Sequence, residues 1–263
     1  MPEGDTVWLA GRRLHQTLAG QPLTRTDFRV PALATVDLSG RGVTEVVSRG
    51  KHLLTRIEGG ITLHTHFRMD GSWHLYRPAT RWAGGPDHQI RLVLSNADWD
   101  AVGYRLPVVE LLPTTEEDKA VGQLGPDLLA PDFDAGVAVR NLAAAPGREI
   151  GPALLDQRNL AGIGNLYKAE ALFLQRVWPW TPSGAVDLAP LVVRAQRLLD
   201  ANRHRPEQAT TGSLRRGEQH WVFERSRRPC RRCSTTVRVA PQGDPPRERL
   251  TYWCPTCQPA PAG

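Results

Sequence analysis

Two pairs of cysteines constrain the fold of this 263-residue chain more than any other feature. Each pair has the spacing Cys-x-x-Cys, and twenty residues separate the two pairs. Four thiolates with this spacing can surround one zinc ion, and cysteines confined to one segment are typical of a metal site rather than of a disulfide framework. The spacing predicts a structural zinc site, with an iron–sulfur or redox centre as the alternative. The predicted ligands are Cys230, Cys233, Cys254 and Cys257.

Residues 236–253, between the cysteine pairs, are predicted to form a β-hairpin around a turn at residues 241–246, which makes the segment a zinc ribbon. A ribbon of this size cannot bury a core, so metal binding should supply its folding free energy. Protein ligands fill all four positions, and we therefore expect a metal that takes no part in catalysis. Arginines on the ribbon predict contact with phosphate groups; they are Arg231, Arg232, Arg238, Arg247 and Arg249.

The net charge of +6 is distributed unevenly along the chain. Residues 194–249 contain 14 arginines and six acidic residues, a net charge of +8, which leaves −2 for the rest of the chain. Such a block predicts a phosphate-binding surface for nucleic acid, with a solvated basic face as the alternative. The chain has 30 arginines and only three lysines, so each lysine is informative; they are Lys51, Lys119 and Lys168.

The first part of the chain has the pattern of an antiparallel β-sandwich or barrel with one flanking helix. The helix is predicted at residues 5–18, with Asp5 as its N-cap. Residues 61–68 alternate between apolar and polar side chains, as in a strand with one buried face. Further strands are predicted at residues 43–47, 51–57, 72–76, 89–95 and 100–112, with glycines marking turns between them.

Helical spacing replaces strand alternation after residue 124, so the chain is predicted to be a multidomain α+β protein. Helices are predicted at residues 134–144, 150–157, 165–175 and 187–203, followed by an arginine-rich loop at 205–228. The predicted divisions are an N-terminal domain at 1–112, a linker at 113–125, a helical domain at 126–228, and the zinc ribbon with the C-terminal tail at 229–263. No apolar run approaches the roughly 18 residues that a membrane span needs, which predicts a cytoplasmic protein without membrane contact.

Two shorter motifs point to chemistry. Residues 162–165 read Gly-Ile-Gly-Asn directly before a predicted helix, where backbone N–H groups and the helix dipole can bind a phosphate. A purely structural turn is the alternative. At the start of the chain, removal of Met1 would leave Pro2 as a secondary amine beside the carboxylate of Glu3. Many proteins begin with Met-Pro, so this opening has no functional meaning without support from the rest of the chain.

That support comes from the order in which the motifs occur. The elements that matter are residues 2–4, 49–54, 66–71, 154–157, 161–165 with Glu170, and Arg249 followed by residues 252–255. In these elements and over essentially its full length, the sequence resembles the formamidopyrimidine-DNA glycosylase and endonuclease VIII family. Its opening residues and Tyr252-Trp253-Cys254 are more similar to the endonuclease VIII branch. The resemblance implies an N-terminal β-sandwich and a helix-two-turn-helix domain that carries the zinc-ribbon hairpin.

The resemblance implies that Pro2 attacks C1′ of a damaged nucleotide. An α-amine has a pKa of roughly 8, so part of it is neutral and nucleophilic at the pH of the cell. The secondary amine forms an iminium ion, which acidifies the C2′ proton and permits β-elimination and then δ-elimination. Glu3 matches the family's general acid and base, with a helix-capping acid as the alternative.

Further residues match positions that hold the DNA. Lys51 matches the family lysine that contacts the reacting sugar-phosphate, with an ordinary turn lysine as the alternative. Arg249 matches the ribbon arginine that binds phosphates beside the lesion and is implicated in δ-elimination. Gly164 and Asn165 match the helix-two-turn-helix turn on the same backbone.

The damaged nucleotide must leave the base stack to reach the nucleophile, and a side chain fills the gap. Met69 matches this wedge residue, with Arg68 and Asp70 beside it, and a core methionine is the alternative. The chain departs from the family in carrying Thr6 near a position where glutamate is common, which affects contacts with the damaged base or sugar.

Three histidines, His64, His66 and His74, lie at alternate positions of predicted strands. We interpret them as exposed strand histidines rather than as ligands of a second metal ion.

These features predict a bifunctional DNA glycosylase and abasic-site lyase of base excision repair. We expect it to remove oxidised bases, pyrimidines in preference to 8-oxoguanine, and to cleave the strand through a Schiff base. Its expected partner is damaged double-stranded DNA of a bacterial nucleoid, bound by a monomer. One alternative is an enzyme that processes abasic sites or single-stranded lesions with weak glycosylase activity. The other is a zinc-ribbon DNA-binding protein without catalysis.

The basic block predicts that DNA affinity depends strongly on salt. If the protein neutralises about six phosphates, its affinity for DNA should fall by roughly 10³-fold between about 50 and about 200 mM salt. The reason is that releasing counterions from the DNA gains less entropy when the surrounding salt is more concentrated. Fluorescence anisotropy with a duplex oligonucleotide measures this slope. A slope near zero would mean that the arginines form only a solvated face.

Overall fold

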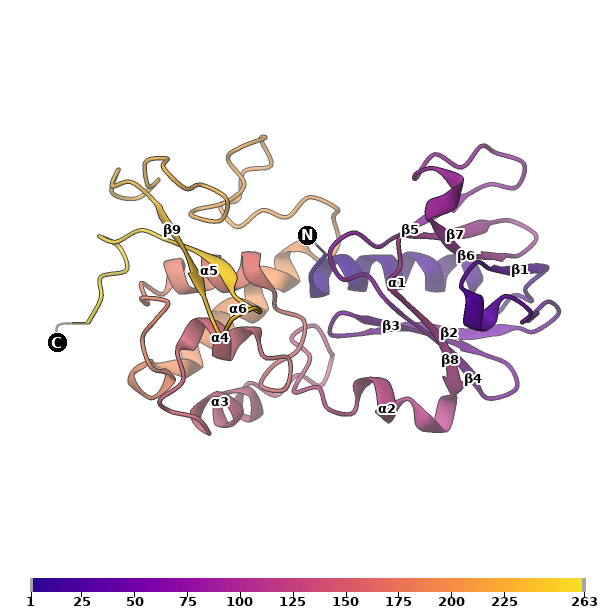
Figure 1. Cartoon of the computed structure of the whole chain (residues 1–263), viewed down its shortest axis with the longest axis horizontal. Coiled ribbons are helices and arrows are strands. Elements are labelled where there is room, and N and C mark those ends of the chain that lie inside the picture. Colours follow the sequence, from indigo (N-terminus) through magenta and orange to yellow (C-terminus); the bar gives the residue numbers. More distant parts are fainter. Residues whose placement is uncertain (1, 262–263) are drawn as a thin grey trace. The chain divides into compact units, whose positions relative to one another are not determined.

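The computed structural model describes residues 2–261, which divide into two compact units, Met1–Gln123 and Leu124–Gly263 (Figure 1). The first unit contains two antiparallel four-stranded sheets. Its only long helix within the described residues is α1 (Gly4–Leu18), and a short helix, α2 (Asp118–Val121), follows the last strand. No helix among the described residues is both long and apolar enough to cross a bilayer.

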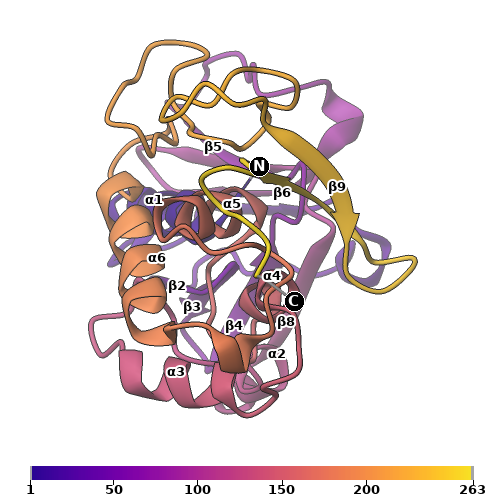
Figure 2. The ribbon, with the colours of Figure 1, turned by 90° about the vertical axis from the view of Figure 1, so that its left-hand side faces the viewer.

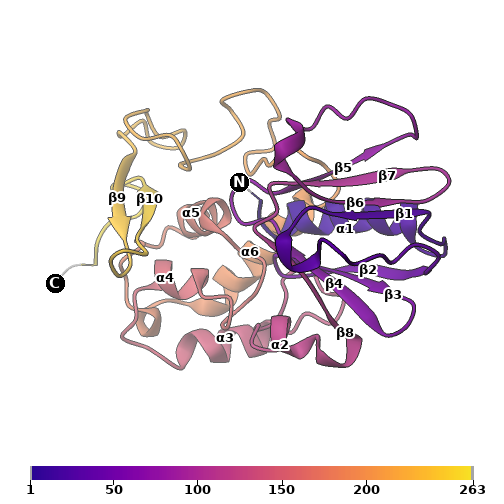
Figure 3. The same cartoon turned by 45° about the vertical axis from the view of Figure 1, so that its right-hand side comes forward.

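One sheet of the first unit has the strand order β1-β6-β7-β5, and the other has the order β2-β3-β4-β8 (Figure 3). The strands of the first sheet are β1 (Arg25–Phe28), β6 (Ile90–Ser95), β7 (Asp100–Tyr104) and β5 (Ser72–Tyr76). Those of the second are β2 (Val43–Arg49), β3 (His52–Ile57), β4 (Ile61–His66) and β8 (Val108–Pro113). Short 3-10 turns lie at Pro31–Leu33, Asp87–Gln89 and Thr114–Glu116.

The core of the first unit lies between the two sheets and α1. Its buried side chains come from both sheets and from one face of the helix; they include Val7, Leu14, Leu18, Phe28, Leu53, Leu63, Leu92 and Leu94. The expected antiparallel sandwich with a flanking helix is therefore confirmed.

Three expectations for this unit are wrong in detail. Residues 100–112 form two strands in different sheets, because Arg105 adopts φ +48 and Pro107 lacks an N–H group to continue the ladder. Strand β1 escapes prediction because only Phe28 of its four residues is buried. Helix α1 begins at Gly4, so Glu3 holds the N-cap position and Asp5 lies inside the first turn.

The second unit is built around α5 (Asn165–Leu174), of which every residue but the last is buried. It packs against α4 (Ile150–Leu155), α6 (Leu188–Asn202) and strand β10 (Arg249–Trp253) (Figure 2). Helix α3 (Ala135–Ala143) packs against α6, and its N-cap Asp134 accepts hydrogen bonds from the N–H groups of Gly136 and Val137. A 3-10 turn lies at Ser183–Ala185.

Strands β9 (Arg238–Gln242) and β10 form the predicted antiparallel hairpin, in which Arg249 pairs with Gln242 and Trp253 with Arg238. Residues 205–228 contain neither a helix nor a strand, as predicted.

The fully buried carboxylate of Glu170 on α5 holds this irregular segment. Its Oε1 accepts hydrogen bonds from the backbone N–H groups of Val222 and Phe223, both at 2.9 Å. Its Oε2 accepts a hydrogen bond from the N–H group of Trp221 at 2.8 Å and another from the Thr210 hydroxyl. One carboxylate therefore satisfies four donors of the segment.

We predict that Glu170→Gln loosens residues 205–228. The amide NH₂ group would face two of the four donors, which costs about 1–3 kcal/mol per unsatisfied group. Trypsin should then cleave faster in this arginine-rich segment, as followed by mass spectrometry. Glu207→Gln, an exposed change in the same segment, is the control. Equal cleavage rates in the two variants would show that Glu170 does not hold the segment.

Candidate active site and metal centre

The direction of α1 brings the start of the chain to one end of the second sheet. His15 Nδ1 accepts a hydrogen bond from the N–H group of Val46, and a Cβ at Gly11 would lie 3.6 Å from the backbone nitrogen of Ser48. The later helix residue, His15, contacts the earlier strand residue, Val46, and the earlier helix residue, Gly11, lies near the later strand residue, Ser48. The helix and the strand therefore run antiparallel. The first residues of α1 therefore lie toward the end of β2 that leads into Lys51.

Pro2 lies two residues before the start of α1 and is partly buried. Glu3 is fully buried, and its carbonyl accepts the first hydrogen bond of the helix from Val7. Its side chain makes no capping hydrogen bond, and a carboxylate at this end of a helix is favoured by the helix dipole. Met1 lies outside the described residues, so its removal stays a prediction.

Lys51 lies in a two-residue turn that connects β2 to β3, where Arg49 pairs with His52. Gly50 adopts φ +58, the left-handed conformation that a II′ hairpin turn requires at its first central position. This conformation favours glycine and presents Lys51 at the tip of the turn, with its side chain half-buried.

The predicted wedge lies in the loop between β4 and β5, at the same end of the second sheet, because β3 and β4 are antiparallel and His52 pairs with His66. Met69 is 48% exposed and is not part of the core. Gly71 closes the loop by donating a hydrogen bond to the carbonyl of Phe67 at 2.9 Å. A Cβ at Gly71 would lie 2.7 Å from Phe67, so the turn requires glycine.

Arg105, the first residue after β7, holds this loop in place. Its Nε donates to the Asp70 carbonyl at 3.0 Å, and its Nη1 donates to Gln89 Oε1 at 2.5 Å. A hollow of about 400 Å³ lies here; it is lined by Phe67, Arg68, Met69, Asp70, Arg91, Arg105, Leu106 and Pro107.

The expectation of exposed strand histidines is wrong, because His64 is buried and His66 and His74 are partly buried. The ring of His64 lies against the ring of His52 and against the carboxylate of Glu110. Burial is the largest cause that lowers the pKa of His52 to about 3 and that of His66 to about 4, and the neighbouring histidines and the charge of Lys51 contribute to both values. Both imidazoles are therefore neutral near pH 7.

In the second unit, Gln157 shapes the glycine turn ahead of α5. Its Oε1 accepts a hydrogen bond from the Gly162 N–H group at 3.0 Å, and its Nε2 donates to the carbonyl of Ile163 at 3.0 Å. Gly162 adopts φ +100, which favours glycine, and Gly164 is the N-cap of α5. The backbone N–H groups of the first helical turn are thus held in place.

Asn165 links this turn to the hairpin. Its Nδ2 donates to the carbonyl of Leu250 at 2.8 Å, so Asn165 lies beside the strand that Arg249 begins. Arg249 is exposed, and the side chain of its neighbour Leu250 is also 53% exposed. The structure therefore places the buried Asn165 beside the strand that begins with the exposed Arg249.

Lys168 continues this link inside the unit. Its buried Nζ donates to Thr251 Oγ1 at 2.6 Å, and that hydroxyl donates to Gln242 Oε1 at 3.0 Å. Gln242 Nε2 in turn donates to Glu149 Oε2 and to the carbonyl of Pro179, at 3.0 and 2.8 Å. The chain of hydrogen bonds fixes both strands of the hairpin to α5 and to the start of α4.

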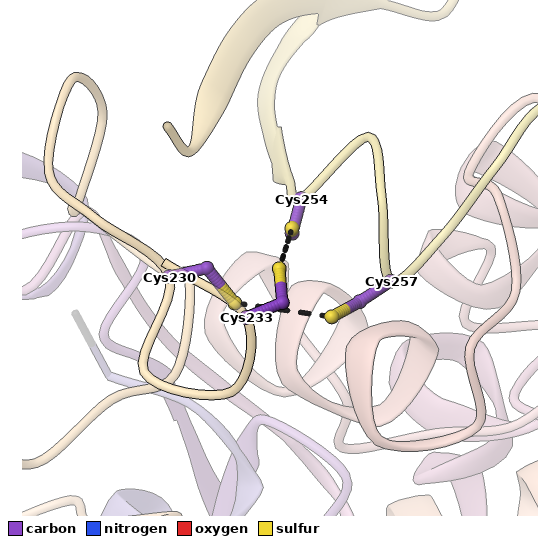
Figure 4. Close-up of side chains that lie close together, drawn as sticks. All are labelled: Cys230, Cys233, Cys254 and Cys257. Carbon is purple, nitrogen blue, oxygen red and sulfur yellow. Dashed lines mark hydrogen bonds between the residues drawn. The ribbon is translucent and has the colours of Figure 1, made fainter. Parts of the chain in front are cut away.

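The four cysteines come together as predicted, from the turn before β9 and the turn after β10 (Figure 4). Their sulfur atoms all lie within 4.8 Å of one another, and the separations Cys233–Cys254 and Cys230–Cys257 are 3.4 and 3.9 Å. Tetrahedral thiolate ligands about 2.3 Å from a zinc ion would be separated by roughly 3.8 Å. The donor set and its spacing therefore fit one tetrahedral metal ion.

Sequence reasoning missed the His52–His64–Glu110 cluster and the roles of Lys168 and Arg105. The rarity of lysine singled out Lys168 without indicating a buried role. The histidine cluster depends on strand register, which pairs His64 with Glu110 across β4 and β8.

Comparison with known proteins gives the family. The profile of the formamidopyrimidine-DNA glycosylase N-terminal domain matches residues 1–105, and that of the formamidopyrimidine-DNA glycosylase H2TH domain matches residues 124–200. The chain belongs to the formamidopyrimidine-DNA glycosylase family. This membership confirms the resemblance that the sequence motifs indicated.

Relatives of the endonuclease VIII type match this family member along its length. A Streptomyces coelicolor protein named probable endonuclease 8 2 is 62% identical over all of this chain and 95% of its own length. A Mycolicibacterium smegmatis protein named DNA-(apurinic or apyrimidinic site) lyase Nei2 is 47% identical over 99% of this chain and its own full length. The fold matches a Lactococcus lactis Fpg complex with abasic-site DNA, with a TM-score of 0.81, 21% identity, and coverage of 98% of this chain and 100% of that one.

We predict that Lys168→Met weakens the attachment of the hairpin to α5. Loss of the ammonium donor to Thr251 should lower the free energy of unfolding by about 1.5–3 kcal/mol. It should also reduce DNA affinity, because Arg249 begins the strand that carries Thr251. Thermal unfolding and anisotropy measure the two effects. Lys119→Met removes an exposed ammonium paired with Glu116 and should change neither quantity, so equal behaviour of both variants would contradict the buried role.

Proposed function

We propose that this protein is a bifunctional DNA glycosylase and abasic-site lyase of base excision repair, acting on damaged double-stranded DNA with Pro2 as its nucleophile. The observation that carries the proposal is the position of Pro2 and Glu3 at the end of the unit that also carries the Lys51 turn. Full-length relatives named endonuclease 8 and DNA-(apurinic or apyrimidinic site) lyase support it.

In this mechanism the mature Pro2 nitrogen attacks C1′ as the damaged base leaves, and the sugar ring opens to an iminium ion. Glu3 protonates the ring oxygen as the ring opens. The positive nitrogen then draws electrons from C2′, and removal of the C2′ proton expels the 3′ phosphate. A second elimination expels the 5′ phosphate. Burial of Glu3 suits this role, because water competes less for its protons.

Lys51 is proposed to hold the reacting sugar-phosphate by its positive charge. Met69 is proposed to fill the gap that the displaced nucleotide leaves, since it is an exposed apolar side chain on a braced loop. Arg68 and Asp70, on either side of it, would contact the DNA around the gap. Thr6 lies in the first turn of α1, near the position where glutamate is common in the family.

The second unit is proposed to bind the DNA backbone through the N–H groups at Gly164, the amide of Asn165 and the guanidinium of Arg249. Zinc is the ion that four cysteine thiolates at this spacing fit best, and it would supply folding free energy to the hairpin. We assign catalysis to residues 1–112 and DNA binding to residues 126–228 and 229–263, joined by 113–125. We expect a monomer that acts on the bacterial nucleoid.

Trapping with borohydride tests the nucleophile, because the reagent reduces an iminium ion to a stable amine. With an abasic-site oligonucleotide, we expect a covalent complex with the mature protein. Yield should fall at least tenfold in Pro2→Gly and disappear when Met1 is retained, whereas Lys51→Ala should slow trapping without abolishing it. Trapping that ignores both N-terminal changes would place the nucleophile elsewhere.

A second candidate is an abasic-site lyase with weak glycosylase activity, which the name of the Mycolicibacterium smegmatis relative favours. Cleavage of oligonucleotides that carry an oxidised pyrimidine, 8-oxoguanine or an abasic site, in duplex and single-stranded form, separates the two. We expect the duplex with an oxidised pyrimidine to be cut faster than the one with 8-oxoguanine. Cleavage of the abasic substrate alone would establish the second candidate.

A further inference from the structure

A continuous line of hydrogen bonds crosses three neighbouring strands of the second sheet. Glu110 on β8 and His64 on β4 face each other, with 2.6 Å between Oε1 and Nδ1. His64 Nε2 lies 2.8 Å from Nδ1 of His52, the first residue of β3. The two imidazole rings lie side by side in nearly the same plane, with their centroids 5.0 Å apart and their planes inclined by 16°. His64 is buried, whereas the side chain of Glu110 is 53% exposed.

The chemistry of the three groups gives this line a direction. A carboxylate can only accept, so His64 Nδ1 carries the proton that it shares with Glu110. With a single proton on His64, its Nε2 accepts, so His52 donates from Nδ1 and keeps a lone pair on Nε2. The pKa of His52, about 3, keeps the second imidazole neutral and preserves this arrangement near pH 7. An acceptor at one end thus orients two imidazole rings in series.

The inner end of the line lies where two predicted DNA-contacting segments begin. His52 directly follows Lys51 and pairs with His66, the last residue of β4. The rings of His52 and His66 meet edge-on at 4.7 Å. His66 Nδ1 accepts a hydrogen bond from the N–H group of Arg68 at 2.9 Å. Contacts therefore run without interruption from Glu110 to the loop that carries Met69.

We propose that Glu110, His64 and His52 form a positioning relay that holds the Lys51 turn in register with the Met69 loop, so that displacement of the nucleotide and engagement of its sugar occur together. The inference rests on the proposed function. None of the three residues needs to touch the DNA. Their hydrogen-bonded rings are stiff groups at the two strand ends, and the charged groups that face the relay are Lys51 and Arg68.

The test uses variants at the exposed end of the relay, because Glu110 can be changed without opening a cavity. Glu110→Ala removes the acceptor of His64, whereas Glu110→Gln keeps an oxygen acceptor and removes the charge. Glu116→Ala, a partly exposed carboxylate in the same unit, is the matched control. His64→Phe interrupts the relay at its centre.

Two signals are followed at saturating full-length protein: 2-aminopurine fluorescence beside an abasic site for nucleotide displacement, and borohydride trapping for the covalent step. In the wild-type protein and Glu116→Ala, we expect the two to develop together. In Glu110→Ala and His64→Phe, fluorescence should keep its amplitude while trapping slows at least fivefold. Glu110→Gln should recover trapping to within about twofold of the wild-type rate, since the acceptor is retained.

Trapping at the wild-type rate in Glu110→Ala would overturn the relay. So would an equal loss of fluorescence, trapping and thermal stability that Glu110→Gln does not rescue, because that pattern marks a purely structural role. Failure of the wild-type protein to trap at all would instead overturn the proposed function. If His64→Phe does not fold, the two Glu110 variants still test the relay.

Discussion

The close antiparallel packing of α1 on β2 is the contact on which the rest of the first unit depends. A backbone nitrogen has no side chain to extend it, so it can react only where the fold holds the beginning of the chain. Gly11 allows this close approach, because a Cβ there would lie 2.9 Å from the buried Leu53 Cδ1 and would require that side chain to shift. The same packing buries Glu3 beside Pro2 and directs both toward the turn that carries Lys51.

Helix α5 has the corresponding role in the second unit, because nearly all of its residues are buried against neighbouring elements. Its first residue, Asn165, and its fourth, Lys168, hold the hairpin, and Glu170 holds the irregular segment that follows α6. Three polar side chains within six residues thus hold the hairpin and the irregular segment that follows α6. Such buried polar groups cost stability unless all are paired, which explains why they form connected networks.

The success of sequence reasoning followed the range of each interaction. Local signals succeeded: the cysteine spacing, the helical periodicity of the second unit and the motifs that identify the family. Features set by tertiary packing were not predicted correctly. Residues 100–112 divide between two sheets, and β1 was missed. The burial of His64 could not be read from its strand, because the carboxylate that pairs with it comes from β8, more than forty residues later. The roles of Pro2, Lys51 and Met69 rest on family resemblance, and the geometry only brings them to one end of the unit.

Glu170 holds residues on both sides of the stretch 211–220 but none within it. Residues 211–220 lie between the anchored Thr210 and Trp221, and the N–H group of Thr210 donates to the carbonyl of Gln219, which closes the stretch at its base. Substitutions or length changes within this stretch leave the anchors untouched. The residues between the anchors can therefore differ in sequence while the buried carboxylate and the core around it stay the same.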